Sequence, residues 1–294
     1  MFPLLIYGGT MIVSVSRRTD VPAFYSDWFF NRLKEGFAET KNPMNPKQIR
    51  IVSLKPEDVD CFVFWSKNPL PMVDKLDLLS GYGFYFQFTL NGYGEDIEAA
   101  LPALNERAET MKRLCSKVGK ERIVWRYDPI LITEKYTVKF HKDMFGMLAE
   151  KLGGCFDGCV ISFVDRYGKN ARAFDEKGIR ELTYEEMTEL AESFSATGRE
   201  CGFEINTCAE KVELGLYGIG HSSCIDVRRI ERIIGREINA EADKNQRKGC
   251  GCAVSADIGA YDTCGHGCVY CYANRSVKSV YNGYAKHDPD SPHM

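Results

Sequence analysis

Residues 84–126 read FYFQFTLNGYGEDIEAALPALNERAETMKRLCSKVGKERIVWR, and this stretch decides the fold class. It begins with an apolar run, Phe84 to Leu90, and ends with a second one, Arg122 to Arg126. Between them, Glu95 to Lys117 has helical periodicity, and Gly119 follows as a stop signal. Continuous apolar strands joined by an amphipathic helix are typical of a parallel sheet covered by helices. The stretch therefore predicts one β–α–β unit.

The same alternation continues on both sides of this unit. Further strands are predicted at residues 12–16, 50–54, 61–65, 159–164 and 203–207, and further helices at 26–35, 139–152, 184–199 and 227–234. About six or seven such units in a row predict an α/β protein with a full or partial parallel (β/α) TIM-like barrel. A doubly wound open sheet is the alternative.

The length and composition of the chain limit its organisation and its partners. Its 294 residues suffice for one barrel, which takes about 250 residues. We assign residues 11–239 to the barrel-like domain, 240–294 to a cysteine-rich segment packed on its mouth, and 1–10 to an N-terminal extension. The net charge of −3 gives no support to nucleic-acid binding. No apolar run approaches the roughly 20 residues of a membrane helix, and the first ten residues lack the features of a signal peptide. We expect a cytoplasmic protein without a membrane partner.

Cysteine is unusually frequent and unevenly placed. Seven of the 12 cysteines lie between residues 208 and 271, namely Cys208, Cys224, Cys250, Cys252, Cys264, Cys268 and Cys271. Clustered cysteines in a chain with no sign of secretion bind metal or do redox chemistry more often than they form disulfides. The other five are scattered among apolar or helical stretches, and Cys159 is expected to be buried.

The stretch from Cys264 to Cys271 reads CGHGCVYC, a C-x3-C-x2-C motif. Three thiolates at this spacing can hold three irons of a 4Fe–4S cluster on one short loop, which leaves the fourth iron open for an exchangeable ligand. Gly265 and Gly267 favour such tight wrapping. We interpret His266 as a solvent-side spacer rather than a ligand.

The remaining four clustered cysteines can hold a second 4Fe–4S cluster, since four thiolates complete one. The predicted ligands are Cys208, Cys224, Cys250 and Cys252. Two alternatives stay open: Cys208 and Cys224 can be ordinary buried thiols, and structural zinc also uses four cysteines. Zinc sites are usually built from paired C-x2-C turns, and this region has only one such pair, Cys268 and Cys271.

Polar residues follow the predicted strands at the end where barrel active sites are built. Those assigned to cofactor or substrate binding are Ser16, Arg17, Arg18, Lys67, Asn68, Arg126, Asp128 and Glu210. The arginines and the lysine would suit an anionic or carboxylate-bearing ligand. Asp128 could be a general base or could pair with Arg126. Glu210 could orient a ligand amine or cap the next helix.

The C-x3-C-x2-C motif, with Tyr270 before its third cysteine, resembles that of the radical S-adenosylmethionine enzymes. That resemblance implies an open iron that chelates the amino and carboxylate groups of S-adenosylmethionine, and a partial-barrel core. In those enzymes the three cysteines normally follow the first strand, whereas here they lie near the C-terminus. Over nearly its whole length the chain also resembles a family of uncharacterised proteins, a domain of unknown function, with a C-terminal cysteine cluster of this kind. The matching stretches are residues 16–20, 64–68, 125–129, 207–210 and 287–289.

Three functions follow as hypotheses. The first is an iron–sulfur, radical-S-adenosylmethionine-like enzyme with one or two 4Fe–4S clusters and a small anionic substrate. It would need an electron donor such as ferredoxin or flavodoxin. The second is a non-enzymatic iron–sulfur electron carrier or redox sensor, which would use four protein ligands on each cluster. The third is an enzyme that modifies or repairs nucleic acid.

Overall fold

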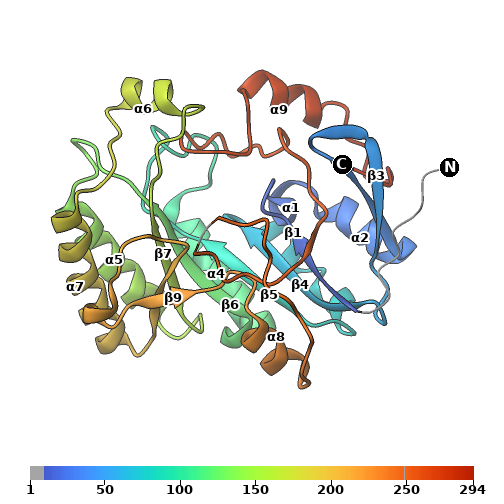
Figure 1. The fold of residues 1–294 in the computed structure, drawn as a ribbon, viewed down its shortest axis with the longest axis horizontal. Helices are drawn as coiled ribbons and strands as arrows, with labels where there is room; N and C mark the ends of the chain where they lie inside the picture. Colours follow the sequence, from blue (N-terminus) through green and yellow to red (C-terminus); the bar gives the residue numbers. More distant parts are fainter. Residues whose placement is uncertain (1–9, 248) are drawn as a thin grey trace.

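A parallel sheet forms the centre of the protein in the computed structural model, which describes residues 10–247 and 249–294 (Figure 1). Its eight strands follow the order β10-β1-β4-β5-β6-β7-β8-β9, and every neighbouring pair is parallel. The strands are β1 (Met11–Val15), β4 (Val59–Ser66), β5 (Phe84–Thr89), β6 (Ile123–Ile130), β7 (Cys159–Phe163), β8 (Ile205–Cys208), β9 (Gly220–Ser222) and β10 (Ala256–Asp257).

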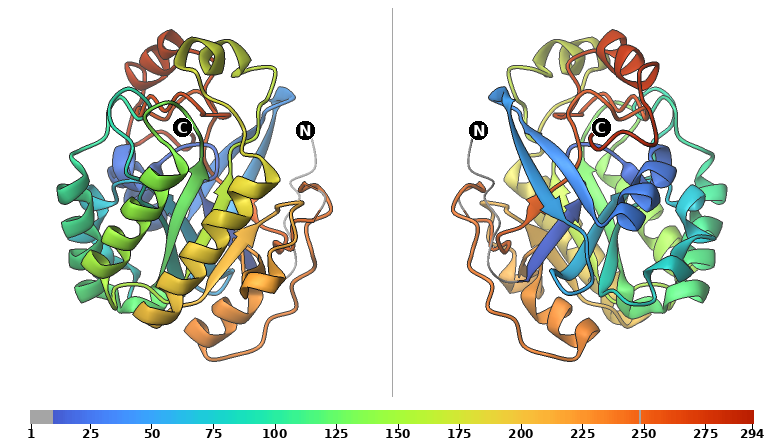
Figure 2. Two further views of the ribbon diagram at one scale, coloured as in Figure 1. Left: turned by 90° about the vertical axis from the view of Figure 1, so that its left-hand side faces the viewer. Right: turned by 90° about the vertical axis from the view of Figure 1, so that its right-hand side faces the viewer.

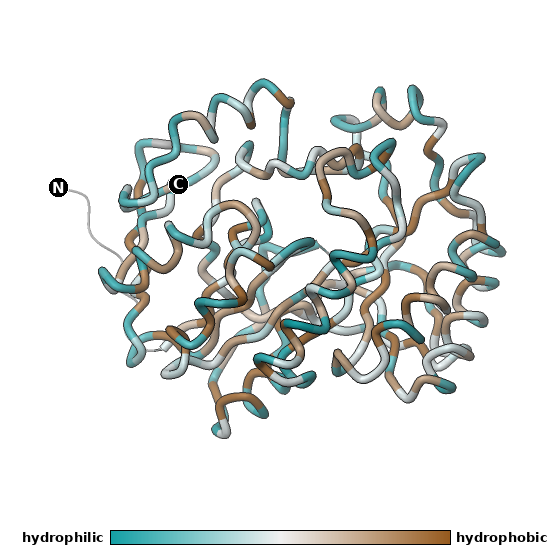
Figure 3. Tube along the Cα trace, turned by 180° about the vertical axis from the view of Figure 1, so that it is seen from behind, coloured by the Kyte–Doolittle hydropathy of each residue, from teal (hydrophilic) through white to brown (hydrophobic). Residues whose placement is uncertain are grey.

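The two faces of the sheet are covered differently. One face packs against α2 (Ser26–Glu35), α4 (Leu104–Val118), α5 (Val138–Leu152) and α7 (Tyr184–Cys201) (Figure 2). The opposite face packs against α8 (Val227–Ile234) and the cysteine-rich segment that follows it. These helices alternate between hydrophobic and hydrophilic residues (Figure 3), as burial of one side requires.

Shorter elements connect these layers. They are α1 (Val21–Phe24), α3 (Leu70–Val73), α6 (Ala171–Lys177), α9 (Val277–Tyr284), and the 3-10 turns Leu76–Leu79, Lys120–Arg122 and Gly215–Tyr217. A separate antiparallel hairpin joins β2 (Phe37–Asn42) to β3 (Asn45–Ser53).

The predicted α/β class with a large parallel sheet is confirmed. Within the described residues β9 and β10 form the two edges and do not pair with each other, so the sheet is open. A closed barrel is therefore not observed, and the pairing agrees with the open-sheet alternative.

Aromatic side chains fill the space between the sheet and its helices. Trp125 of β6 stacks on Phe145 of α5 with ring centroids 4.8 Å apart, and Phe145 stacks on Phe194 of α7 at 4.0 Å. Such pairs add about 0.5–1.5 kcal/mol each beyond the area they bury. They fix α5 and α7 against β6, the strand that carries Asp128, one of the predicted site residues.

Two sequence predictions are wrong in their details. The helix predicted from Glu95 begins only at Leu104, because the residue before Pro102 disfavours helical geometry and residues 97–100 bond to the cysteine segment instead. The strand predicted at residues 50–54 belongs to the hairpin rather than to the main sheet.

β10, the last strand in the chain, lies at one edge of the sheet. β10 pairs with β1, so that residues more than 240 positions apart become neighbours. The Asp257 carboxylate accepts hydrogen bonds from Ser14 Oγ (2.9 Å), Ser16 Oγ (2.5 Å) and the Arg17 backbone N–H (2.9 Å). This carboxylate connects the cysteine-rich segment to the start of the sheet. The boundary at residue 239 stays a prediction.

Two further predictions concern the N-terminal extension and the absence of a membrane helix. Residues 1–9 of the predicted N-terminal extension lie outside the described residues. In the part of the chain that the structure describes, no helix has the length and apolar character needed to span a membrane.

Asp257→Asn should lower the free energy of unfolding by at least about 2 kcal/mol, because hydrogen bonds to a charged group contribute roughly 1.5–3 kcal/mol each. The NH₂ of the introduced amide would also face groups that are themselves hydrogen-bond donors to Asp257. Urea unfolding followed by circular dichroism measures the change. Asp27→Asn is the matched control: it removes only a solvent-exposed ion pair with Lys75 and should cost less than about 1 kcal/mol. Equal effects would contradict the role given to Asp257.

His141 predicts a pH dependence of stability. Burial lowers the pKa of this imidazole to about 4, and its nitrogens bond to Tyr127 Oη and the Leu131 carbonyl. When the pH drops below the ordinary pKa of 6.5, the unfolded chain takes up a proton at this histidine that the folded chain does not. The free energy of unfolding therefore decreases as the pH is lowered. Between pH 7.5 and 5 this contribution should lose about 2 kcal/mol, at 1.36 kcal/mol per pH unit below 6.5.

Urea unfolding at both pH values tests this dependence in the wild type and in His141→Gln, which keeps a donor and an acceptor. The variant should lose that part of the slope. His221→Gln, which changes a partly exposed histidine, is the control and should keep it. An unchanged slope in His141→Gln would rule out His141 as its source.

Candidate functional site

The cysteine motif lies against the carboxyl edge of the sheet. Its loop pairs with the segment after β5 through two backbone hydrogen bonds: Ala100 N–H to the His266 carbonyl (3.0 Å) and Val269 N–H to the Ile97 carbonyl (2.9 Å). Tyr25 Oη donates to the Thr263 carbonyl at 2.7 Å. The chain therefore brings its three motif cysteines to the end of the sheet where we expected the mouth.

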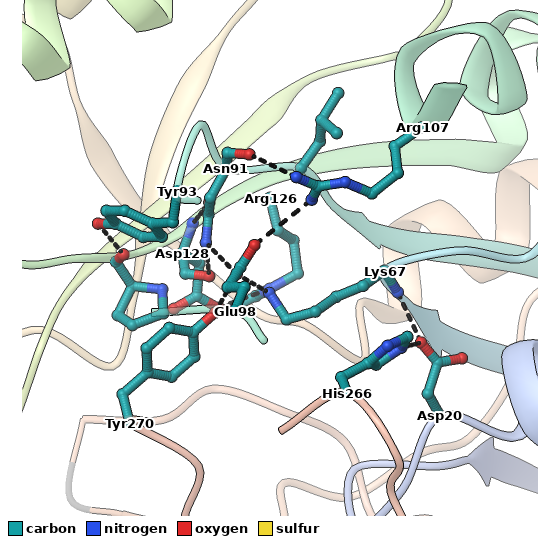
Figure 4. A network of polar contacts seen from close by, with 12 residues as sticks. Asp20, Lys67, Asn91, Tyr93, Glu98, Arg107, Arg126, Asp128, His266 and Tyr270 are labelled. Atoms are coloured by element: carbon teal, nitrogen blue, oxygen red, sulfur yellow. Dashed lines mark hydrogen bonds and ion pairs between the residues drawn. The ribbon is translucent and has the colours of Figure 1, made fainter. Parts of the chain in front are cut away.

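Glu98 is the centre of the contact between this loop and the sheet (Figure 4). Its side chain is fully buried, and its carboxylate contacts Lys67 Nζ at 2.8 Å and Arg107 Nη1 at 3.5 Å. Tyr270, between the second and third motif cysteines, donates its hydroxyl to the same carboxylate. Burial opposes ionisation, but Lys67 and Arg107 together lower the pKa of Glu98. An ionised carboxylate thus joins the strand ends to the motif.

His266 is buried, contrary to the expectation of a solvent-side spacer. Its Nε2 lies 2.7 Å from Asp20 Oδ2, and its ring packs on Phe24 with centroids 4.7 Å apart. Asp20 Oδ2 also accepts from the Lys67 backbone N–H at 2.7 Å. Asp20 therefore connects the motif to the ends of β1 and β4.

The four other clustered cysteines meet at a second place, which we call the four-thiol group: Cys208, Cys224, Cys250 and Cys252. Cys208 ends β8, and its Sγ lies 2.8 Å from Cys224 Sγ. Hydrogen bonding with Cys224 is the main cause that lowers the pKa of Cys208 to about 7 and that of Cys252 to about 5. Cys250 also bonds to Cys252. The group lies on the sheet face that α8 covers.

Arg126 links the four-thiol group to the strand ends. Its buried guanidinium donates to Cys224 Sγ (2.9 Å), to Gln87 Oε1 (3.3 Å) and to the Asp128 carboxylate (2.9 Å from Nε). Although burial opposes it, the charge of Arg126 lowers the pKa of Asp128. This geometry favours the ion pair over a general base, the other role considered for Asp128.

Asn91 joins the two centres into one network. Its Nδ2 donates to the Asp128 carbonyl at 2.8 Å and lies 3.4 Å from Glu98 Oε1. Its Oδ1 accepts from the Asp128 backbone N–H at 2.9 Å. A continuous path of polar contacts therefore runs from Tyr270 through Glu98, Asn91 and Asp128 to Arg126 (Figure 4). Arg126 extends this path to Cys224.

Glu210 is a separate, partly buried carboxyl group. It accepts from the Phe163 backbone N–H at 3.0 Å, so it bonds to β7 instead of capping a helix. Burial raises the pKa of Glu210 to about 7, with a smaller contribution from Asp165.

The other predicted binding residues fall into two groups. Ser16 and Arg18 stabilise the β10 connection: Ser16 Oγ donates to Asp257, and Arg18 Nη1 donates to the Gly259 carbonyl at 3.3 Å. Within the described residues the Arg17 side chain makes one hydrogen bond, to Ser255 Oγ at 3.3 Å. The Asn68 side chain has no hydrogen bond to the described residues, so it remains available to a ligand.

The sequence analysis did not identify two residues of the network, Glu98 and Arg107, and it noted Tyr270 only as part of the cysteine motif. Glu98 and Arg107 were included in one predicted amphipathic helix, where charged residues indicate a solvated face. Asp20 and Asn91 follow predicted strands, and that position was the one available signal for them.

The described residues contain no group of three or more Cys, His, Asp or Glu side chains that could hold a metal ion in their present positions. The thiols of each cysteine group are near one another, yet they would have to rotate to coordinate a common ion or cluster.

The chain belongs to a family described as a domain of unknown function (DUF1848), whose pattern matches residues 12–273. The matched region includes the whole sheet apart from Met11, all seven clustered cysteines and the network around Glu98. No curated protein matches the chain.

Glu98→Gln should loosen the motif loop, because it leaves Lys67 and Arg107 buried without a counter-charge. Breaking a buried ion pair in this way costs about 3–5 kcal/mol. Alkylation of Cys264, Cys268 and Cys271 in metal-free protein, followed by mass spectrometry, should become faster. Tyr270→Phe removes only one hydrogen bond and should give a smaller effect in the same direction.

Glu109→Gln is the control for this series, because its ion pair with Lys112 lies on the exposed side of α4. It should leave both stability and alkylation unchanged. If Glu98→Gln alkylates at the wild-type rate, the carboxylate does not hold the loop.

Proposed function

We propose that this DUF1848 member is an iron–sulfur enzyme related to the radical S-adenosylmethionine enzymes. Cys264, Cys268 and Cys271 would hold a 4Fe–4S cluster with one open iron, and the four-thiol group would hold an auxiliary cluster. S-adenosylmethionine would be the ligand of the open iron. Ferredoxin or flavodoxin would supply electrons.

The position of the motif relative to the sheet supports this proposal most directly. In radical S-adenosylmethionine enzymes the three cysteines normally follow the first strand. Here they follow β10, which is last in the chain but lies at the sheet edge beside β1. The motif thus has the same spatial relation to a parallel sheet, although its place in the sequence differs.

Unpartnered polar atoms at the same end of the molecule fit a bound ligand. Trp65 Nε1, His266 Nδ1 and Asn274 Oδ1 are buried without a hydrogen-bond partner in the described structure. Trp65 lies near the end of β4, and the other two belong to the motif segment. Buried polar atoms normally find partners, so these atoms indicate a missing group. A bound cluster with an open iron would supply a ligand site and an electron.

The cations at this edge are unequally available for an anionic substrate. Lys67 and Arg126 are already paired with Glu98 and Asp128. Among the described residues, the Arg17 side chain donates only to Ser255 and the Asn68 side chain has no hydrogen bond, so both have donors left for a ligand. We therefore assign substrate contact to Arg17 and Asn68, and positioning to Lys67 and Arg126.

One observation favours a second candidate for the four-thiol group, structural zinc. Sulfur atoms that share one zinc ion at about 2.3 Å lie closer together than sulfurs on different irons of a cluster. The 2.8 Å separation of the Cys208 and Cys224 sulfurs is nearer to the roughly 3.8 Å between two thiolates of one tetrahedral zinc ion than to the wider spacing of thiolates on a cluster. The protein would then keep the motif cluster and use zinc to fix β8 to the cysteine-rich segment. An electron carrier or redox sensor remains the alternative if the motif cluster gains a fourth protein ligand.

Metal analysis after anaerobic purification tests the proposal. Two clusters predict about eight irons per chain, and Cys250→Ser/Cys252→Ser should leave about four. Replacing Cys264, Cys268 and Cys271 by serine should remove the other four. The electron paramagnetic resonance signal of the reduced protein should change when S-adenosylmethionine is added.

Each departure from this result has its own meaning. About four irons and one zinc would assign zinc to the four-thiol group. A full complement of iron with an unchanged signal would favour the electron carrier. Protein that binds no iron under anaerobic reconstitution would overturn the proposal.

A further inference from the structure

We infer that a cavity on the outer side of the motif loop binds a nucleoside phosphate unit, either free or within a single strand. The cavity has a volume of about 430 Å³. It is lined by the two stretches that flank the motif, residues 258–262 and 272–275, and by the β2–β3 hairpin. This inference goes beyond the proposed function and does not require a bound cluster.

The architecture explains why a cavity forms here. β10 is only two residues long, so the chain leaves the sheet edge at Gly259 and returns to it only after the motif. The hairpin projects past this same edge (Figure 2), and its Glu39 N–H bonds to the Pro292 carbonyl at 2.7 Å. Three segments far apart in the sequence thus enclose one space whose size is normal for a small-ligand site.

The charges that line the cavity suit phosphate. Lys41 is exposed and has no ion pair with a described residue. Lys169 Nζ donates to the Tyr272 carbonyl at 2.6 Å, a neutral partner that leaves the lysine charge uncompensated. Of the two acidic lining residues, Asp262 is paired with Arg275 at 2.6 Å, whereas Glu39 lies 3.5 Å from His293, which offsets the Glu39 charge only when the imidazole is protonated. A phosphate would complete the pairing of the two lysines.

The aromatic and apolar lining suits a base. Tyr261 and Tyr272 are 42% and 55% exposed, although large aromatic side chains are usually more buried. Ile49 and Ile51 lie opposite Lys41 and Glu39 in the hairpin, and cross-strand partners share a face of the sheet. Both isoleucines are exposed on that face of the hairpin. Bases stack on such surfaces without regard to their identity.

Binding of a labelled single-stranded oligonucleotide, followed by fluorescence anisotropy, tests the inference on the full chain. Lys41→Glu/Lys169→Glu should weaken binding at least about tenfold and reduce the salt slope by about 1.4, at 0.7 per phosphate contact. Tyr261→Ala should weaken it at least about fivefold, whereas Tyr261→Phe should not, because stacking needs only the ring.

The charge-matched control is Lys55→Glu/Lys120→Glu. These lysines precede β4 and β6, so they lie at the amino edge of the sheet, opposite the motif. The control should bind as the wild type does. Equal weakening by both pairs would mean unspecific attraction and would overturn the inference. The metal content of the Lys41/Lys169 variant should be unchanged, so failure here is separate from failure of the proposed function.

Competitors distinguish the source of the ligand. Displacement by a mononucleotide such as AMP supports a nucleoside phosphate site, with a free nucleotide as the simplest ligand. Displacement only by unlabelled oligonucleotide supports a nucleotide unit within a strand. If inorganic phosphate displaces the probe as well as AMP does, the rings contribute nothing, and the nucleoside part of the inference is wrong.

Discussion

The parallel pairing of β10 with β1 is the constraint on which the rest of the structure depends. It places the start of the cysteine-rich segment at the sheet edge, and the contacts of Tyr270 with Glu98 and of His266 with Asp20 then hold the motif loop against the strand ends. The pairing involves only a few residues, but the Asp257 carboxylate strengthens it. This carboxylate accepts hydrogen bonds from two hydroxyls and one backbone N–H in β1 and the residues just after it. The segment that carries the three motif cysteines and the flanks of the cavity begins at this pairing.

The buried charges around Glu98 serve position more than stability. Two cations and one carboxylate lose their hydration there, and an apolar replacement would often be as stable. Charged groups, however, accept only partners of defined geometry. Glu98 requires Lys67, Arg107 and the Tyr270 hydroxyl to meet at one point. Such a requirement fixes the loop in one register against the strand ends, which apolar packing alone specifies less sharply.

How much could be predicted from the sequence depends on how local the causes are. The strands around Phe62, Phe86 and Trp125 could be predicted, because a short continuous apolar run is typical of a buried strand. The grouping of Cys208, Cys224, Cys250 and Cys252 also followed from composition. In contrast, β10 has two residues and no periodicity, and its pairing is a long-range property of Asp257. The burial of Glu98 could not be predicted, because the helix-like sequence around it gives no indication of the loop that covers it.

The position of the motif after the last strand has a consequence for how a metal centre would form. Where the cysteines follow the first strand, the loop precedes in the chain most of the sheet that supports it. Here the sheet, the Lys67–Glu98–Arg107 pairing and the ends of β1 and β4 are all complete in the chain before Cys264 appears. The loop then docks on a finished surface through few backbone bonds. A ligand that binds only the docked form would stabilise that form by mass action, so the occupancy of the motif and the order of the C-terminal segment would rise together.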